Sequence, residues 1–111
     1  MSALISTVEL KRKIDNKDQE DFVVVEVLGP DSFAEFHLPG AVNVPVDDTF
    51  EANIQTAVPD KHKPVAVYCR DIECHASAKA IRRMELLGYT NLFEYHMGKD
   101  GWKAAGMPVE K

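Results

Sequence analysis

Cys69 is the residue in this sequence whose type and position most favour chemistry. It ends an apolar run at residues 64–68 and stands just before a helix predicted to begin near His75. A helix N-terminus favours a thiolate, but its dipole contributes at most about 2 kcal/mol, or about 1.5 pKa units. Several loop N–H groups must supply the rest of any lowering from the usual value of about 8.5. An inert core cysteine is the alternative, but the carboxyl end of a strand is where open α/β sheets bind ligands.

Cys74 lies five residues further on, and two interpretations of it remain open. It could pack beneath the start of the helix as a buried free cysteine. It could instead be a resolving thiol that attacks an oxidised or persulfidated Cys69 and closes a disulfide. The second interpretation requires that the two Cα atoms lie within about 7 Å. Such a short loop gains little chain entropy from a disulfide, so the bond would be a chemical event rather than a structural brace.

Three other polar side chains are candidates for supporting the thiol. Ser77, on the first helical turn, could bond a loop carbonyl or the thiolate, or be a simple helix hydroxyl. His75 is predicted to rest in solvent, since an imidazolium is unfavourable at a helix N-terminus. His96 follows the last predicted strand and could approach from the side. These residues lack a zinc-binding spacing such as C-x₂-C, so no metal site is predicted.

Composition predicts an ordinary single-domain protein spanning residues 1–111. Hydrophobic residues make up 45% and charged residues 28%, and the formal net charge is −5. The acidic balance argues against a nucleic-acid partner. The N-terminal residues do not resemble a signal peptide, and no apolar run approaches a membrane span. With two cysteines, too few for a disulfide scaffold, we expect the reducing cytoplasm and no membrane association.

Strands and helices alternate along the chain. Strands are predicted over residues 22–28, 41–44, 65–68 and 92–95, and the first is continuously apolar, as in a parallel sheet covered on both faces. Helices are predicted from the Ser6 cap to about Asn16, over residues 32–36 with Asp31 as cap, from residue 47 to about 57, and from His75 to residue 87 before Gly88. The first helix should bury Val8, Leu10 and Ile14, and the last of these helices Ala76, Ala80, Met84 and Leu87. Phe93 and Trp102 are predicted core residues. This alternation predicts a parallel α/β sheet.

Four segments together resemble the rhodanese family. The first strand leads to FHLPGAVNVP at residues 36–45, which is similar to the family's G-H-I-P-G-A-x-N-I-P signature. The strand, loop and helix around Cys69 resemble its active-site segment, and residues 98–109 resemble its closing G-G-x-x-W…G-x-P-V signature. The resemblance implies a rhodanese-like α/β fold with a central, mostly parallel sheet of about five strands and helices on both faces.

The resemblance also implies an activity. Cys69 would accept a sulfane sulfur, become a persulfide and pass the sulfur on, with no cofactor. The implied partners are a small donor (thiosulfate, a polysulfide or a persulfide) and a thiol or cyanide acceptor, and the acceptor could also be a protein. The implied active-site loop consists of Cys69, Arg70, Asp71, Ile72, Glu73 and Cys74, followed by His75. His37 resembles the family's turn histidine, whose role is usually structural.

Departures from the family pattern bear on that activity. Leu28 stands where the family usually has an arginine after the strand. Asp71 and Glu73 would repel the thiosulfate dianion unless they point outward, while Arg70 could contact an anionic donor. These features leave an alternative, a non-catalytic or redox-sensing module that uses a Cys69–Cys74 disulfide. A phosphatase-type reaction is disfavoured because His75 replaces the arginine that would hold the oxyanion.

Overall fold

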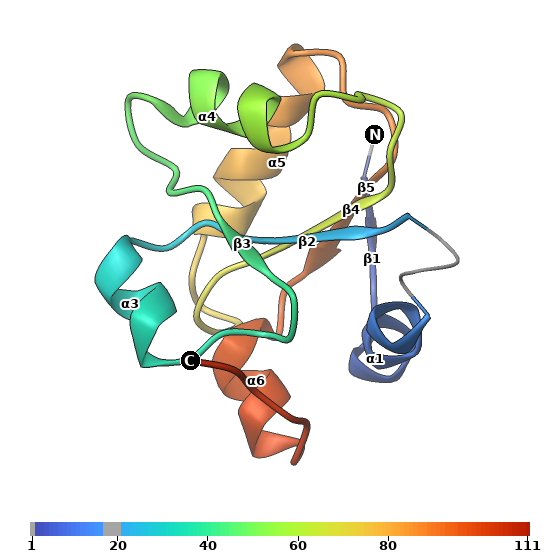
Figure 1. The fold of residues 1–111 in the computed structure, drawn as a ribbon, viewed down its shortest axis with the longest axis vertical. Coiled ribbons are helices and arrows are strands. Elements are labelled where there is room, and N and C mark those ends of the chain that lie inside the picture. Colours follow the sequence, from blue (N-terminus) through green and yellow to red (C-terminus); the bar gives the residue numbers. More distant parts are fainter. Residues whose placement is uncertain (1, 17–20) are drawn as a thin grey trace.

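A computed structural model describes residues 2–16 and 21–111 and shows a five-stranded, fully parallel sheet between two layers of helices (Figure 1). The strand order is β1-β5-β4-β2-β3. The strands are β1 (Ser2–Leu4), β2 (Val23–Glu26), β3 (Val42–Asn43), β4 (Val65–Tyr68) and β5 (Leu92–Tyr95). The predicted α/β class, with a parallel sheet of five strands and helices on both faces, is confirmed.

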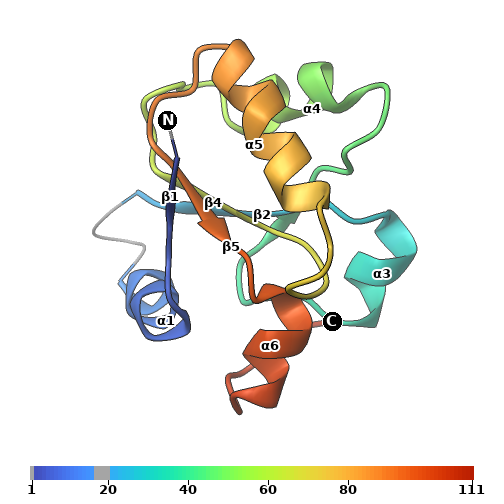
Figure 2. The same ribbon diagram turned by 180° about the vertical axis from the view of Figure 1, so that it is seen from behind.

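The helices divide between the two faces of the sheet, as the opposite view also shows (Figure 2). On one face, α4 (Phe50–Ala57) and α5 (Ala76–Leu86) pack over a core that includes Val25, Val67 and Cys69. On the other face, α1 (Thr7–Asp15), α3 (Pro30–Glu35) and α6 (Gly98–Ala104) contribute Leu10, Phe33 and Trp102 to a second core. The central β4 is buried along its whole length, so the carboxyl end of β4 is the best-fixed point of the sheet.

Several predicted elements are confirmed with adjusted ends. The apolar run at 22–28 supplies β2, which ends at Glu26, and β3 is limited to two residues. His75 is the N-cap of α5, which therefore begins one residue later than predicted. Gly88 follows the C-cap of α5 with a φ of +99°, a conformation that glycine adopts readily.

Other predictions were wrong. The strand β1 was not anticipated, because its three residues are exposed and carry no alternating pattern. Helix α3 begins at Pro30 after Gly29, with no side-chain cap from Asp31, because proline favours the first helical position. Val8 is 74% exposed rather than buried. On α5, Ser77 and Ile81 are buried with Ala80 and Met84, while Ala76 and Leu87 pack at the edge of the core.

Candidate active site

The carboxyl end of β4 places Cys69 where the sheet meets two helices. The backbone of α6 holds the start of the loop, since Lys99 N donates to Cys69 O at 3.0 Å and Asp100 N donates to Arg70 O at 2.9 Å. Gly98 permits this approach. Its φ is +71°, and a Cβ at this position would lie 2.4 Å from the carbonyl carbon of Arg70. The loop that follows Cys69 is therefore fixed at its origin by main-chain contacts.

Asp71 organises the middle of the loop rather than pointing into solvent. Its carboxylate accepts hydrogen bonds from the backbone N–H groups of Glu73 and Cys74, each at 3.1 Å. The backbone N–H of Cys74 also points at the Asp71 carbonyl, at 3.2 Å. Glu73 and Ile72 are exposed. One acid of the loop is thus a structural acceptor, and the other faces outward.

The Cys69 thiol is buried, with an exposed fraction of 0%. Its Sγ lies 3.5 Å from the Cys74 carbonyl oxygen and 3.5 Å from Ser77 Oγ. Burial, together with the neighbouring Cys74 thiol, raises the pKa of Cys69 above its ordinary value, although the hydroxyl and then the backbone amide of Ser77 oppose the shift. The expected lowering of the Cys69 pKa by the loop and helix is therefore wrong for this conformation, because desolvation outweighs the main-chain donors.

Cys74 shows the opposite behaviour. It is half-buried and packs against the edge of the core beneath α5. Burial raises the pKa of Cys74, but the hydrogen bond from the Cys69 thiol and the backbone N–H groups of Ala76 and Arg70 outweigh burial, so the pKa is lowered overall. Both cysteines are free thiols within hydrogen-bonding range of each other. This arrangement suits nucleophilic attack by one sulfur and thiol–disulfide exchange between the two.

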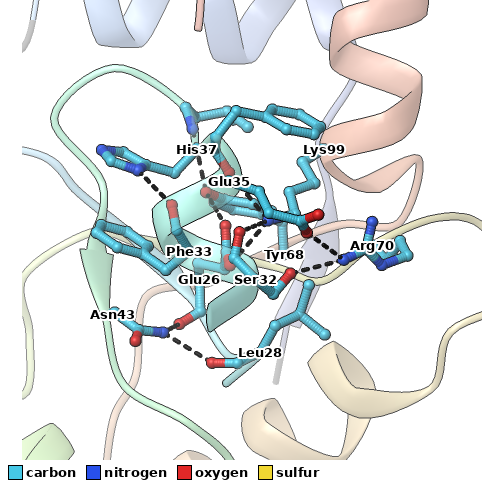
Figure 3. Close-up of polar contacts among 12 residues, drawn as sticks. Glu26, Leu28, Ser32, Phe33, Glu35, His37, Asn43, Tyr68, Arg70 and Lys99 are labelled. Atoms are coloured by element: carbon cyan, nitrogen blue, oxygen red, sulfur yellow. Dashed lines mark hydrogen bonds and ion pairs between the residues drawn. The ribbon is translucent and has the colours of Figure 1, made fainter. Parts of the chain in front are cut away.

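Arg70 points away from the sulfur and joins the loop to two helices. Its guanidinium donates to Ser32 Oγ at 2.7 Å and pairs with Glu35 at 3.4 Å, as Figure 3 shows, and lies 3.7 Å from an Asp100 carboxylate oxygen. The positive charge of Arg70 is therefore shared with two carboxylates. Its role in this conformation is to fasten the loop to α3 and α6.

The predicted histidines occupy three separate environments. His37 stacks on Phe33 with ring centroids 3.8 Å apart, and its Nδ1 lies 2.9 Å from the Phe33 carbonyl oxygen (Figure 3). Its backbone pairs with that of Glu110 near the C-terminus, so the contacts of His37 are those of a structural residue. His75 is exposed at the N-cap of α5. Nδ1 of His96, just after β5, is buried without a hydrogen-bond partner among the described residues.

A buried ion pair next to the loop was missed by sequence reasoning. Lys99 Nζ lies 3.2 Å from Glu26 Oε2, and both side chains are 0% exposed. Lys99 also donates to the carbonyls of Ser32 and Phe36, while the other Glu26 oxygen accepts from Tyr68 at 2.9 Å (Figure 3). Burial, reinforced by the Glu26 charge, raises the pKa of Tyr68. Lys99 thus gives Glu26 a cation where Leu28 replaces the expected arginine. The signal in the sequence was an acid inside an apolar strand run.

Glu94 is a second missed residue. It lies in β5, paired in register with Val67 of β4, and its Oε2 accepts a hydrogen bond from Ser77 Oγ at 3.0 Å. The sequence analysis offered a loop carbonyl or the thiolate as partners of Ser77 and not Glu94, because strand register decides which β5 residue faces the start of α5. The structure therefore links the buried sulfur to a carboxylate through one hydroxyl.

Within residues 2–16 and 21–111, no three His, Cys, Asp or Glu side chains are grouped so that they could hold a metal ion. None of the helices in this same part of the chain has both the length and the apolar character that crossing a bilayer requires.

Comparison with known proteins identifies the family. The sequence profile of the rhodanese-like domain matches residues 6–105. The thiosulfate sulfurtransferase PspE of Escherichia coli is 37% identical over 87 residues, which are 78% of this chain and 77% of that protein. A solved rhodanese from E. coli is 31% identical, with a TM-score of 0.66 over 81% of this chain and 98% of the other. The rhodanese-like domain of the Anabaena protein Alr3790 is 21% identical, with a TM-score of 0.81 over 99% of this chain and 80% of the other. With this fold, and with Cys69 at the carboxyl end of β4, the chain belongs to the rhodanese-like domain family.

Proposed function

We propose that this protein is a sulfurtransferase that carries sulfane sulfur as a persulfide on Cys69. The observation that carries the proposal is the position of Cys69, at the carboxyl end of a buried parallel strand, in a loop held by the backbone of α6 and followed by α5. The 37% identity to a thiosulfate sulfurtransferase supports the same reaction class.

The reaction divides into two sulfur transfers. In the first, the Cys69 thiolate attacks the outer sulfur of a donor, a new S–S bond forms, and the donor's own S–S bond breaks. The donor remnant (sulfite from thiosulfate, a shorter chain from a polysulfide, a thiolate from a persulfide) leaves with the electron pair. In the second, an acceptor thiolate or cyanide attacks the outer sulfur, and Cys69 leaves as a thiolate. The cycle needs no cofactor and returns Cys69 to its starting state.

Charge around the loop favours a weakly charged donor over thiosulfate. Asp71 lies beside the Cys69–Cys74 pair, Glu73 is exposed in the same loop, and the guanidinium of Arg70 is shared with Glu35 and Asp100. A dianion such as thiosulfate therefore meets uncompensated acids, and an alkyl persulfide, which carries at most one negative charge, meets less repulsion. The proposed setting is the reducing cytoplasm, where both thiols persist and a low-molecular-weight or protein thiol is the acceptor.

Mass spectrometry tests the proposal directly. The chain is incubated with thiosulfate, a polysulfide or glutathione persulfide, and its tryptic peptides are analysed. Cleavage after Arg70 and Lys79 puts the two cysteines on different peptides. The expected result is one added sulfur on the Cys69 peptide, lost on treatment with cyanide or a thiol. Cys69→Ser should abolish the addition and Cys74→Ser should retain it. An unmodified Cys69 peptide with all three donors would overturn the proposal.

The proximity of the two thiols favours a second candidate function, a redox-sensing module. With a peroxide as oxidant, one cysteine thiolate is oxidised to a sulfenic acid as the peroxide O–O bond breaks. The other thiol then attacks that sulfur, water leaves, and a Cys69–Cys74 disulfide forms. Rapid appearance of one cross-linked peptide under mild peroxide, without sulfurtransferase turnover, supports this candidate. Turnover with a persulfide that depends on Cys69 and not on Cys74 contradicts it.

A further inference from the structure

A hydrogen-bond chain runs from the buried Cys69 sulfur to the surface of the protein. Ser77, fully buried on the first turn of α5, lies 3.5 Å from Cys69 Sγ and 3.0 Å from Glu94 Oε2. Glu94 also lines a surface pocket of about 350 Å³ together with Lys79 and Arg82 of α5. The Ser77 hydroxyl therefore contacts both the Glu94 carboxylate and the Cys69 sulfur.

The Ser77 hydroxyl has one proton and two neighbours that could receive it. A carboxylate is a much stronger acceptor than a thiol sulfur, and the oxygen–oxygen contact is the shorter of the two. The hydroxyl proton therefore points at Glu94, and the oxygen lone pairs point at Cys69. This orientation leaves the Ser77 oxygen, beside the Cys74 carbonyl, as one acceptor for the Cys69 S–H. The Ser77 hydroxyl lowers the pKa of Cys69 when it donates to the sulfur, and its hydrogen bond to Glu94 competes with that donation.

We propose that Glu94 is a positioning residue which, by holding the Ser77 hydroxyl turned away from the sulfur, keeps Cys69 a neutral thiol in the resting protein. When the charge of Glu94 is removed, its oxygen becomes a weaker acceptor, and the hydroxyl can turn and donate to the sulfur, which stabilises the thiolate. Because Glu94 is reachable from the pocket, a change in its charge is transmitted to the buried sulfur. The inference takes from the proposed function only that Cys69 is the reacting thiol.

Other charged groups act on the same sulfur and must be held constant in a test. From the loop, Cys74 acts on Cys69, and Asp71 acts on Cys74. From α5, Lys79, Arg82 and Glu85 line the pocket beside Glu94. The contribution of Glu94 is therefore separable only by variants that change this carboxylate and the hydroxyl individually and together.

The test follows the pH dependence of Cys69 alkylation by iodoacetamide in the full chain, read on the Cys69 peptide and without any sulfur donor. The midpoint of this curve, rather than its plateau, measures the ionisation of the Cys69 thiol. Glu94→Gln should lower the midpoint by about one pH unit, since a hydroxyl that donates to an anion is worth about that much. Glu85→Gln removes a carboxylate from the same pocket and should leave the midpoint in place. In the Ser77→Ala background, the Glu94→Gln shift should disappear.

Three results would overturn the inference. One is an unchanged midpoint in a folded Glu94→Gln protein. Another is an equal shift in the presence and absence of the Ser77 hydroxyl, which would make Glu94 a bare charge acting at a distance. The third comes from Ser77→Ala alone. This milder change allows the midpoint to be measured even if Glu94→Gln fails to fold. A hydroxyl held by Glu94 gives the thiolate only part of its stabilisation, so a rise of the midpoint in Ser77→Ala as large as the fall in Glu94→Gln contradicts the proposal. If Glu94→Gln shifts the midpoint of Cys69 alkylation but the protein does not load sulfur on Cys69, the result counts against the proposed function and not against this inference.

Discussion

Cys69 and Cys74 share one loop but have opposite pKa shifts, and this difference governs the expected pH dependence. Cys69 is buried and its pKa is raised, so its thiolate fraction near neutral pH is small. Below the pKa, the thiolate fraction grows about tenfold per pH unit. Sulfur loading of Cys69 should therefore accelerate steadily from neutral to alkaline pH and level off only above the raised pKa.

Cys74→Ser isolates this effect. The Cys74 thiol contributes to the raised pKa of Cys69, so its replacement should lower the pKa of Cys69 and move the alkaline rise in sulfur loading to lower pH. The measurement is the initial rate of persulfide formation against pH for both proteins, with Cys69→Ser as the blank. Loading that becomes slower in Cys74→Ser at every pH would show that Cys74 assists the reaction rather than restrains it.

Asp71→Asn separates the structural and electrostatic roles of the loop acid. The asparagine oxygen can still accept from the N–H groups of Glu73 and Cys74, so the turn should persist. The lost negative charge had raised the pKa of Cys74 and opposed dianionic donors. We expect thiosulfate turnover to rise by up to about tenfold, within the range of one partly screened charge, while turnover with an alkyl persulfide, at most a monoanion, changes less. Equal changes with both donors would place the effect in loop geometry instead.

At the residue scale, the sequence identified the groups adjacent to Cys69 along the chain and missed those brought to it by the fold. Cys74 and Ser77 follow Cys69 in one loop and one helical turn, so spacing alone places them nearby. Glu94 and Lys99 depend on the register of β5 and on the docking of α6, which local patterns do not contain. The expected lowering of the Cys69 pKa was wrong for a related reason, since burial of the thiol is a property of the whole core.

At the element scale, the docking of α6 against the loop rests on Gly98. Gly98→Ala adds a Cβ 2.4 Å from the Arg70 backbone in a left-handed conformation, so either the loop or α6 must move. The expected loss of stability is about 1–3 kcal/mol in urea unfolding, with slower sulfur loading. Gly106→Ala is the matched control, because Gly106 has a similar φ of +79° and nothing within 4 Å. Equal losses in the two variants would assign the effect to φ alone and remove the steric argument.

Element prediction succeeded where burial imposes a pattern. The continuous apolar runs that became β2 and β4 and the helical spacing of α5 are consequences of packing on both faces of a parallel sheet. The strand β1 was not predicted because it is an exposed edge strand whose formation depends on pairing with the backbone of β5. The start of α3 was misplaced because Pro30 fixes the first turn without help from Asp31.

At the scale of the whole molecule, the Glu26–Lys99 pair connects the central sheet to the two helices that hold the loop. Lys99→Met leaves Glu26 as an uncompensated buried charge and removes the donor from the Ser32 and Phe36 carbonyls. Breaking a buried pair in this way typically costs about 3–5 kcal/mol, a large share of the stability of a small domain. We therefore expect a marked fall in the urea midpoint, together with loss of sulfur loading as α6 loosens from the loop.

A control and a double variant decide whether charge or packing is responsible. Lys103→Met replaces an exposed lysine on the same helix and should change stability by less than about 0.5 kcal/mol. Adding Glu26→Gln to Lys99→Met removes the orphaned charge while keeping an acceptor for the Tyr68 hydroxyl, so the double variant should be more stable than Lys99→Met alone. If the double variant is less stable than Lys99→Met, the carboxylate was tolerated without its lysine. The pair would then hold α3 and α6 chiefly through the lysine's bonds to backbone carbonyls.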